Sequence, residues 1–216
     1  MVEQVFQNLY RVGGALNKRG QSHTYLLVRK EGNILIGHQA PPSAADVREI
    51  KRLGGIAHQF ICHSHDTLRD GKDKARDPHA ELHAAYGGVL HHHEGEKKAV
   101  RRKTKCPQTP FGDEGMRLGS DFEAHYFPAC TEGHSVYRWK SRGRYFLFTS
   151  HSMYIQEGAW AIHCRVRPQA ADVAKLQVDY VFPGYTALDD PAFYRLDDKL
   201  KRSFGRTIRK KLKEAA

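Results

Sequence analysis

Short apolar runs and segments of helical spacing alternate along the first half of the chain. The runs at 23–30 and 33–37 are rich in β-branched and aromatic residues and flank a turn-like Glu-Gly pair, which predicts a hairpin. Residues 41–55 have apolar positions three apart, a serine cap and a Gly-Gly stop, which predicts a helix. The same criteria predict, in order, a strand at 58–64, a helix at 77–88, a strand at 89–93 and a helix at 94–103.

The second half continues this alternation. A strand is predicted at 122–129, and two more at 135–140 and 144–150 form a hairpin around a Ser-Arg-Gly turn. A helix at 168–176 and a strand at 178–184 follow. From about 190 to 214 apolar residues recur three and four apart, which predicts one amphipathic helix with this stripe: Phe193, Leu196, Leu200, Phe204, Ile208 and Leu212. Strands with interspersed helices indicate sheets covered by helices.

Length and composition fit a single domain spanning 1–216, although two small domains are compatible with them. The chain has 216 residues, 40% of them hydrophobic, and no run approaches the roughly 20 apolar residues of a membrane span. The start carries no basic and apolar signal pattern, so we expect a soluble, cytoplasmic protein with no membrane partner. Its four cysteines form no CxxC pair, and we expect free thiols.

The charge balance is strongly basic, and much of it is local. Lysine and arginine number 35 against 24 acidic residues, a formal net charge of +11. Residues 195–214 hold nine basic and three acidic residues, so the predicted last helix carries more than half of the net positive charge. Residues 97–105 form a second basic run. Such runs can attract nucleic acid or another anionic partner. They are more typical of a solvated helix face.

Motifs at predicted strand ends resemble those of the metallo-β-lactamase family. "CHSHD" (62–66) resembles that family's H-x-H-x-D-H loop, "PACTEGHS" (128–135) its P-G-H-T-P-G-S segment, "FTSH" (148–151) its F-T-G-D, and "FPGYT" (182–186) its P-G-H-G. The order is the same and the stretch covers most of the chain. The resemblance implies an α/β fold, an αββα sandwich of two mixed β-sheets face to face and flanked by helices, with the motif loops at one edge.

Carried over by position, the resemblance implies one complete set of metal ligands. His63 and His65 match the first two histidines, Cys130 stands where the third belongs, and His151 replaces the bridging aspartate. In an extended segment His63 and His65 point the same way. Nitrogen and sulfur donors of this kind suit zinc. The expectation is therefore one zinc ion at these four residues, or no metal.

The second metal position of the family lacks its ligands. Thr67 stands where the aspartate belongs, Leu68 where a histidine belongs, and Tyr185 at the histidine of P-G-H-G. Asp66 lies one place early and becomes the candidate catalytic base. We expect no second metal ion.

Other histidines offer weaker signals. His91 and His93 can share one face of a strand, whereas the histidine between them faces away. Together with Tyr185 and His134 they are candidates for the rim of the cleft. A histidine pair four apart at 79 and 83 has helical metal-ligand spacing but no evident third ligand.

Two functions from different classes are compatible with these features. One is a divergent single-metal hydrolase of an unknown small-molecule substrate, with Asp66 activating water. The other is a catalytically inactive member of the fold that binds an anionic partner through its basic surface. Because the metal motifs are degenerate, we expect weak hydrolysis or none.

Overall fold

The computed structural model describes most of the chain. The described residues are 2–17, 20–39, 41–69, 73, 75–165 and 170–214. Residues 168 and 169 of one predicted helix lie outside them, as does the side chain of Leu212. In the described ranges no helix is both long enough and apolar enough to cross a membrane.

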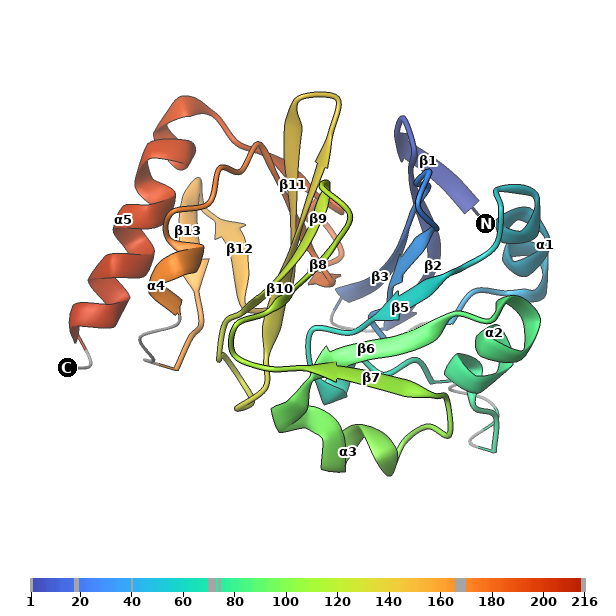
Figure 1. The fold of residues 1–216 in the computed structure, drawn as a ribbon. Helices are drawn as coiled ribbons and strands as arrows, with labels where there is room; N and C mark the ends of the chain where they lie inside the picture. Colours follow the sequence, from blue (N-terminus) through green and yellow to red (C-terminus); the bar gives the residue numbers. More distant parts are fainter. Residues whose placement is uncertain are drawn as a thin grey trace.

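Two β-sheets face each other in the middle of the molecule (Figure 1). The first is mixed and has the strand order β1-β2-β3-β4-β5-β6-β7, with β15 paired to β3 and with parallel pairing from β4 to β7. Its strands are β1 (Val2–Phe6), β2 (Leu9–Asn17), β3 (Gly20–Leu27), β4 (Ile34–Ile36), β5 (His58–Phe60), β6 (Val89–His93), β7 (Gln108–Phe111) and β15 (Tyr185–Thr186).

The second sheet is also mixed, because β11 and β14 run parallel while its other neighbours are antiparallel. Its order is β16-β14-β11-β10-β9-β8. Its strands are β8 (Met116–Leu118), β9 (Phe122–Tyr126), β10 (Ser135–Ser141), β11 (Arg144–Ser150), β14 (Tyr180–Pro183) and β16 (Tyr194–Arg195); a separate hairpin is formed by β12 (Met153–Gln156) and β13 (Ala159–Ile162).

Helices flank the paired sheets on their outer sides (Figure 1). α1 (Ala44–Arg52) and α2 (Pro78–Tyr86) lie beside the first sheet, and α4 (Ala170–Val173) and α5 (Asp198–Glu214) lie beyond the second. The region predicted as one helix at 94–103 is a 3-10 turn, η2 (Glu94–Glu96), followed by α3 (Lys97–Arg101). The predicted αββα sandwich is confirmed.

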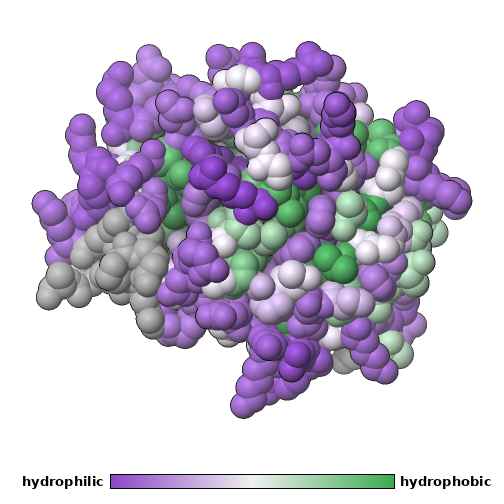
Figure 2. Space-filling view, viewed as in Figure 1, coloured by the Kyte–Doolittle hydropathy of each residue, from purple (hydrophilic) through white to green (hydrophobic). Residues whose placement is uncertain are grey.

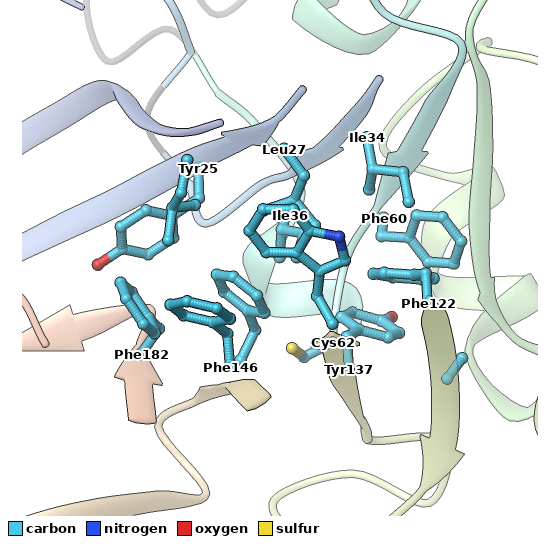
Figure 3. Packing of buried hydrophobic residues seen from close by; sticks show 14 of the residues in the cluster. Tyr25, Leu27, Ile34, Ile36, Phe60, Cys62, Phe122, Tyr137, Phe146 and Phe182 are labelled. Carbon is cyan, nitrogen blue, oxygen red and sulfur yellow. The ribbon is translucent and has the colours of Figure 1, made fainter. Parts of the chain in front are cut away.

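Alternation of side chains along the central strands explains why this arrangement is stable. In β11, Phe146 and Phe148 point into the aromatic core between the sheets, and Leu147 points to the opposite face, under the helices. Successive strand residues face opposite sides, so a strand buried on both faces must be apolar throughout. Figure 3 shows the inter-sheet core, in which Phe146, Phe182 and Tyr25 pack with their neighbours. Large aromatic side chains therefore hold the two sheets together.

The surface outside these layers is mostly polar. Figure 2 shows a largely hydrophilic face, with hydrophobic side chains visible in patches between protruding polar ones. Among the described residues the only large hydrophobic side chain that is exposed is Leu188.

The predicted hairpins are present, and the turn residues explain them. β10 and β11 are joined at Arg142 and Gly143, which have φ values of 51° and 73°. Positive φ at both central residues is the geometry of the two-residue turn that matches strand twist. β3 and β4 pair antiparallel, as predicted for the other hairpin.

The C-terminal helix begins later than predicted. It starts at Asp198 rather than near residue 190, because Tyr194 and Arg195 instead form β16 and pair with β14. Within α5, Phe204 and Ile208 are buried against the second sheet and its hairpin, while the basic residues are exposed. The predicted division into an apolar stripe and a basic face is therefore observed for the side chains described.

His79, on α2, is a hydrogen-bonded core residue. Its Nε2 accepts from the Leu68 N–H at 3.0 Å, so its Nδ1 carries the proton and donates to Gln59 Oε1 at 2.8 Å. Both partners belong to the chain around β5, and His79 is fully buried. Burial lowers the pKa of His79 to about 4. The ring therefore fixes the loop that follows β5 to α2. Because both ring nitrogens are hydrogen-bonded, His79 has none left to share a metal with the half-buried His83.

Replacing Phe204 with alanine should lower the free energy of unfolding by about 3 to 5 kcal/mol, because its ring is buried between α5 and the second sheet. Chemical denaturation measures this loss. Arg206→Ala, at an exposed position of the same helix, is the control and should change stability little. Equal losses in the two variants would mean that α5 does not pack as described.

His79 should make the protein sensitive to acid. Its pKa is about 4 in the folded state and about 6.5 unfolded, so its contribution is present above pH 6.5 and is lost as pH falls toward 4. Between pH 7.5 and 4.5 wild type should lose about 2 to 3 kcal/mol more than His79→Gln, which cannot titrate. Parallel unfolding curves of the two proteins across this range would contradict the prediction.

Candidate metal centre

Three loops bring possible metal donors together at one edge of the sandwich. His63 follows β5, Cys130 lies between β9 and β10, and His151 follows β11. One donor atom from each of these residues lies within 4.8 Å of the other two. The sequence therefore predicted correctly that these strand ends meet.

His63 is fully buried and lies beside a carboxylate. Its Nδ1 is 3.0 Å from Oδ2 of Asp66 in an ion-pair contact, and its Nε2 has no hydrogen-bond partner among the described residues. Burial acts to lower the pKa of His63, but the Asp66 charge outweighs it and raises the pKa to about 10. A carboxylate at Nδ1 leaves Nε2 as the nitrogen that faces a metal, once its proton is displaced.

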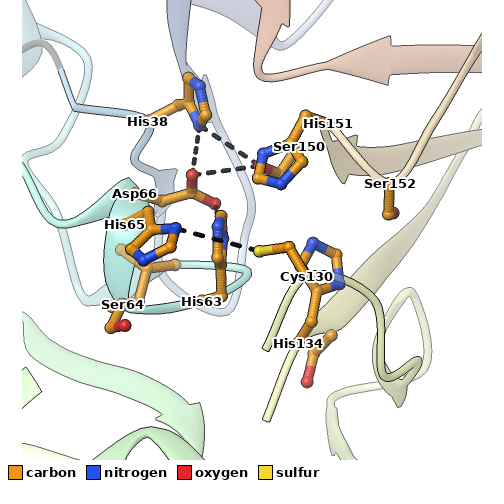
Figure 4. Close-up of polar contacts among 12 residues, drawn as sticks. His38, His63, Ser64, His65, Asp66, Cys130, His134, Ser150, His151 and Ser152 are labelled. Carbon is orange, nitrogen blue, oxygen red and sulfur yellow. Dashed lines mark hydrogen bonds and ion pairs between the residues drawn. The ribbon is translucent and has the colours of Figure 1, made fainter. Parts of the chain in front are cut away.

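Asp66 is the centre of a buried polar network (Figure 4). Its Oδ1 lies 2.5 Å from Nδ1 of His38 and accepts a hydrogen bond from Ser150 Oγ at 3.1 Å. Burial acts to raise the pKa of Asp66, but His38 and His63 outweigh it and hold the pKa well below its usual range. Ser150 has a φ of 52°, a left-handed conformation that is uncommon for serine. The network joins the ends of β4, β5 and β11.

Cys130 and His65 form the solvent side of the centre. Cys130 is exposed, and its Sγ lies 3.9 Å from Nδ1 of His65, which is also exposed. Burial, the charge of His63 and Lys103 together lower the pKa of His65. His65 lies outside the group of three residues whose donors converge within 4.8 Å.

Two further imidazoles lie on the inner side of the centre. The His151 ring centroid is 4.7 Å from that of His63, and burial lowers the pKa of His151 to about 4. His134 is fully buried, with its ring centroid 4.9 Å from His63 and 6.0 Å from His151. Burial holds the pKa of His134 well below its usual range, so the ring is neutral.

Glu96 joins the loop that carries His63 to the loop that carries Cys130. Its carboxylate accepts from the Ser64 N–H at 2.8 Å and from the Gly133 N–H at 3.2 Å, and it is buried. Burial acts to raise the pKa of Glu96, but hydrogen bonds from Thr131 and Ser64 outweigh it and lower the pKa. One carboxylate thus ties the loop of His63 to the loop of Cys130.

The residues at the family's second metal position have other roles. Thr67 is buried and donates to the Ser64 carbonyl at 2.8 Å. Leu68 belongs to the hydrophobic cluster under α1 and α2. Tyr185, in β15, pairs with β3 and lines the cleft described next.

A cleft of about 1020 Å³ opens beside the centre. Cys130 and His151 form part of its wall, so the convergent donors have access to it. The rest of the wall comes from the β12–β13 hairpin, β15 and α5, and includes Tyr154, His163, Tyr185, Tyr194 and Lys211. Tyr154 and His163 stack with their ring planes at 26° and share a hydrogen bond of 3.1 Å. The wall combines aromatic surface with polar groups, as small-molecule sites do.

The candidate rim residues are distributed over different places. Tyr185 lines the cleft, and His134 lies in the interior beside His63. His91 is buried between strands, stacked on Phe60 and 3.0 Å from His58. His93 stacks on Tyr126 and lines a shallow hollow elsewhere. The structure thus brings only Tyr185 of the four to the wall of the main cleft.

Comparison with solved structures identifies the architecture. A B3 metallo-β-lactamase with an active-site glutamic acid is 18% identical, with a TM-score of 0.61 over 99% of this chain and 89% of that chain. MIM-1 from Novosphingobium pentaromativorans is 15% identical, with a TM-score of 0.60 over 99% and 90%. SMB-1, solved with mercaptoacetic acid, is 16% identical, with a TM-score of 0.59 over 96% and 93%. The chain has the metallo-β-lactamase fold.

The likeness to metallo-β-lactamases lies in the fold. No family model matches the sequence, and no curated protein matches it. Identities below 20% leave activity to be argued from the side chains of this chain. Those side chains supply a His/Cys group suited to a metal.

Three residues of the centre have roles that the sequence did not predict. His38 and Glu96 match no motif, and Ser150 lies in the FTSH segment at the glycine of F-T-G-D, a position that implies no ligand. Their roles arise from contacts between residues far apart in the sequence, such as His38 with Asp66 in the first sheet, and Ser150 of the second sheet with Asp66 of the first. A single sequence gives no pairing information at that range.

Glu96→Ala should destabilise the protein by about 2 to 4 kcal/mol, because it leaves two buried N–H groups without their charged acceptor. Hydrogen exchange should accelerate at the Ser64 and Gly133 amides. Glu94→Ala, an exposed neighbour, serves as the control. Unchanged protection at both amides would show that Glu96 does not join the loops.

Proposed function

We propose that the protein is a metal-dependent hydrolase that uses one zinc ion and turns over slowly. One observation carries the proposal: the donors of His63, Cys130 and His151 converge, and two of these residues line a cleft large enough for a small molecule. Catalytic zinc sites combine three protein ligands with a position open to solvent or substrate. The substrate is a small molecule with a hydrolysable acyl or phosphoryl bond.

The residues fit zinc by donor type and by burial. Imidazole nitrogen and thiolate sulfur are preferred zinc donors. His63 Nε2 is a buried nitrogen without a hydrogen-bond partner in the described part of the chain, which is costly unless something binds it. When bound, zinc polarises the bond to be cleaved and lowers the pKa of a water ligand to about 7.

One ion, and no second, is the stoichiometry that we propose. Thr67 and Leu68 are committed to a backbone hydrogen bond and to the hydrophobic core, respectively. Beside them, His38 and Asp66 contact each other in the interior, with Nδ1 of His38 2.5 Å from Oδ1 of Asp66. No second group of three convergent His, Cys, Asp or Glu donors occurs among the described residues.

Asp66 acts through His63 in this proposal. The carboxylate is fully buried and its two oxygens face His38, Ser150 and His63, so it has no open side toward the cleft. A carboxylate at the far nitrogen of a ligand imidazole fixes the ring orientation and raises its basicity. We therefore assign Asp66 as a positioning residue and not as the group that takes a proton from water.

The cleft wall suggests how a substrate is held. Tyr154 and His163 present a stacked aromatic pair, and Tyr185 lies beside the centre. Lys211 of α5 adds a positive charge on the same wall. Such a wall favours a molecule with a flat apolar part and an anionic group.

Hydrolysis should depend on zinc and on His63. Protein purified without a His tag, stripped of metal and reconstituted with zinc, should hydrolyse at least one of three probes: a chromogenic β-lactam, p-nitrophenyl acetate or bis(p-nitrophenyl) phosphate. His63→Ala should reduce the rate by about 100-fold or more, since it removes a ligand. Mercaptoacetate, a compound present in the SMB-1 structure, should inhibit the reconstituted wild type.

His83→Ala is the matched control, because His83 lies on α2 outside the donor group. It should retain the wild-type rate. Bound zinc without turnover of any probe would favour the alternative, a non-catalytic binding protein that uses the exposed basic face of α5. Equal activity of the stripped and reconstituted proteins would overturn the role of the metal.

A further inference from the structure

His134 is a buried imidazole with one nitrogen unused. The ring is fully buried, and its Nδ1 lies 3.1 Å from the Phe127 carbonyl oxygen. A carbonyl only accepts, so Nδ1 carries the proton and Nε2 carries a free lone pair. Nε2 has no hydrogen-bond partner among the described residues. Leaving such an atom unpaired costs about 1 to 3 kcal/mol.

The backbone around His134 holds the ring in place. Phe127 donates its N–H to the His134 carbonyl at 3.0 Å and accepts from the ring with its own carbonyl. Two hydrogen bonds to one residue fix both the main chain and the imidazole. The ring is therefore positioned before any ligand arrives.

The His134 ring, which carries the unused nitrogen, lies beside the metal donors, and like His65 it is outside the group of three whose donors converge within 4.8 Å. The His134 ring centroid lies 4.9 Å from that of His63 and 6.0 Å from that of His151, and Figure 4 shows it beside Cys130. His63 Nε2 is likewise buried and without a hydrogen bond. A cation would bind the lone pair of His134 Nε2 directly and that of His63 Nε2 once the His63 proton is displaced, and it would then satisfy both nitrogens.

We propose that His134 is a metal ligand and that, with His63, Cys130 and His151, it forms a set of three imidazoles and one thiolate. This inference rests on the metal of the proposed function and extends it, because it adds His134 as a fourth donor. The sequence motif implied His65 in that place. The matching position in the motif of the resembling family is a serine, so the role of His134 is particular to this chain.

His65 is the competing fourth donor, and its surroundings differ. It is exposed, so water can satisfy its ring nitrogens and it has no need of another partner. Its ring centroid lies 4.9 Å from that of His63, as far as that of His134. Distance thus separates the two candidates poorly, and burial with an unpaired nitrogen favours His134.

The set has a buried side and an exposed side. His63 and His134 are fully buried and His151 is half-buried, whereas Cys130 faces solvent. Four protein donors complete the number that zinc prefers. With His134 bound, the position that a three-ligand site leaves open to water is filled, so we expect hydrolysis to require one donor to leave and therefore to be slow.

Cobalt(II) substitution distinguishes the two fourth donors. Wild type, His134→Ala and His65→Ala are stripped and titrated with cobalt(II) against a competing chelator, and the visible spectrum is recorded. His134→Ala should weaken binding by about 10- to 100-fold or more, because even residues that only orient a ligand cost that much. His65→Ala should bind as wild type does. Cys130→Ala should lose the sulfur-to-cobalt charge-transfer band, which His134→Ala should keep.

A measurement on wild type covers the case in which His134→Ala fails to fold. Loaded with cadmium-113 and labelled with nitrogen-15, the protein should show scalar coupling between the ion and His134 Nε2. Coupling to His65 with none to His134 would overturn the inference and leave the one-metal proposal standing. Wild type that binds neither cobalt nor cadmium would overturn both.

Discussion

The buried carboxylate of Asp66 is the contact on which the whole centre depends. It meets His63 from β5, His38 from the end of β4 and Ser150 from β11, so it ties the first sheet to the second. A buried charge is tolerated only when it is paired and hydrogen-bonded. Each of these partners must therefore stay in place, and their positions set the orientation of His63 toward Cys130 and His151.

In the proposed function, the same pairing limits the centre to one metal ion. The imidazole of His38 contacts Asp66 in the interior, and the Thr67 hydroxyl donates to the backbone of its own loop. These side chains are therefore committed to contacts within the protein. What stays available to a metal is the group of unpaired nitrogens and the thiolate on the other side of Asp66.

The sequence predicted the central strands and the convergence of their ends, because strands buried on both faces are apolar throughout and their terminal motifs keep a recognisable order. It carried no prediction for β1 and β2, whose Gly-rich, polar stretch lacks a clear period. It also placed the start of α5 too early, since pairing of β16 with β14 overrides helical spacing. The partners of Asp66 and the place of His134 depend on tertiary contacts that local patterns do not encode.

A single metal position between the loops is the central feature of the proposed site. The most direct measurement is an anomalous difference map, at the zinc absorption edge, from crystals grown with excess zinc. We expect one strong peak per chain, surrounded by His63, Cys130 and His151. A second peak of similar height beside Asp66 and Tyr185, or a single peak at an unrelated site such as His93 and Asp113, would contradict it.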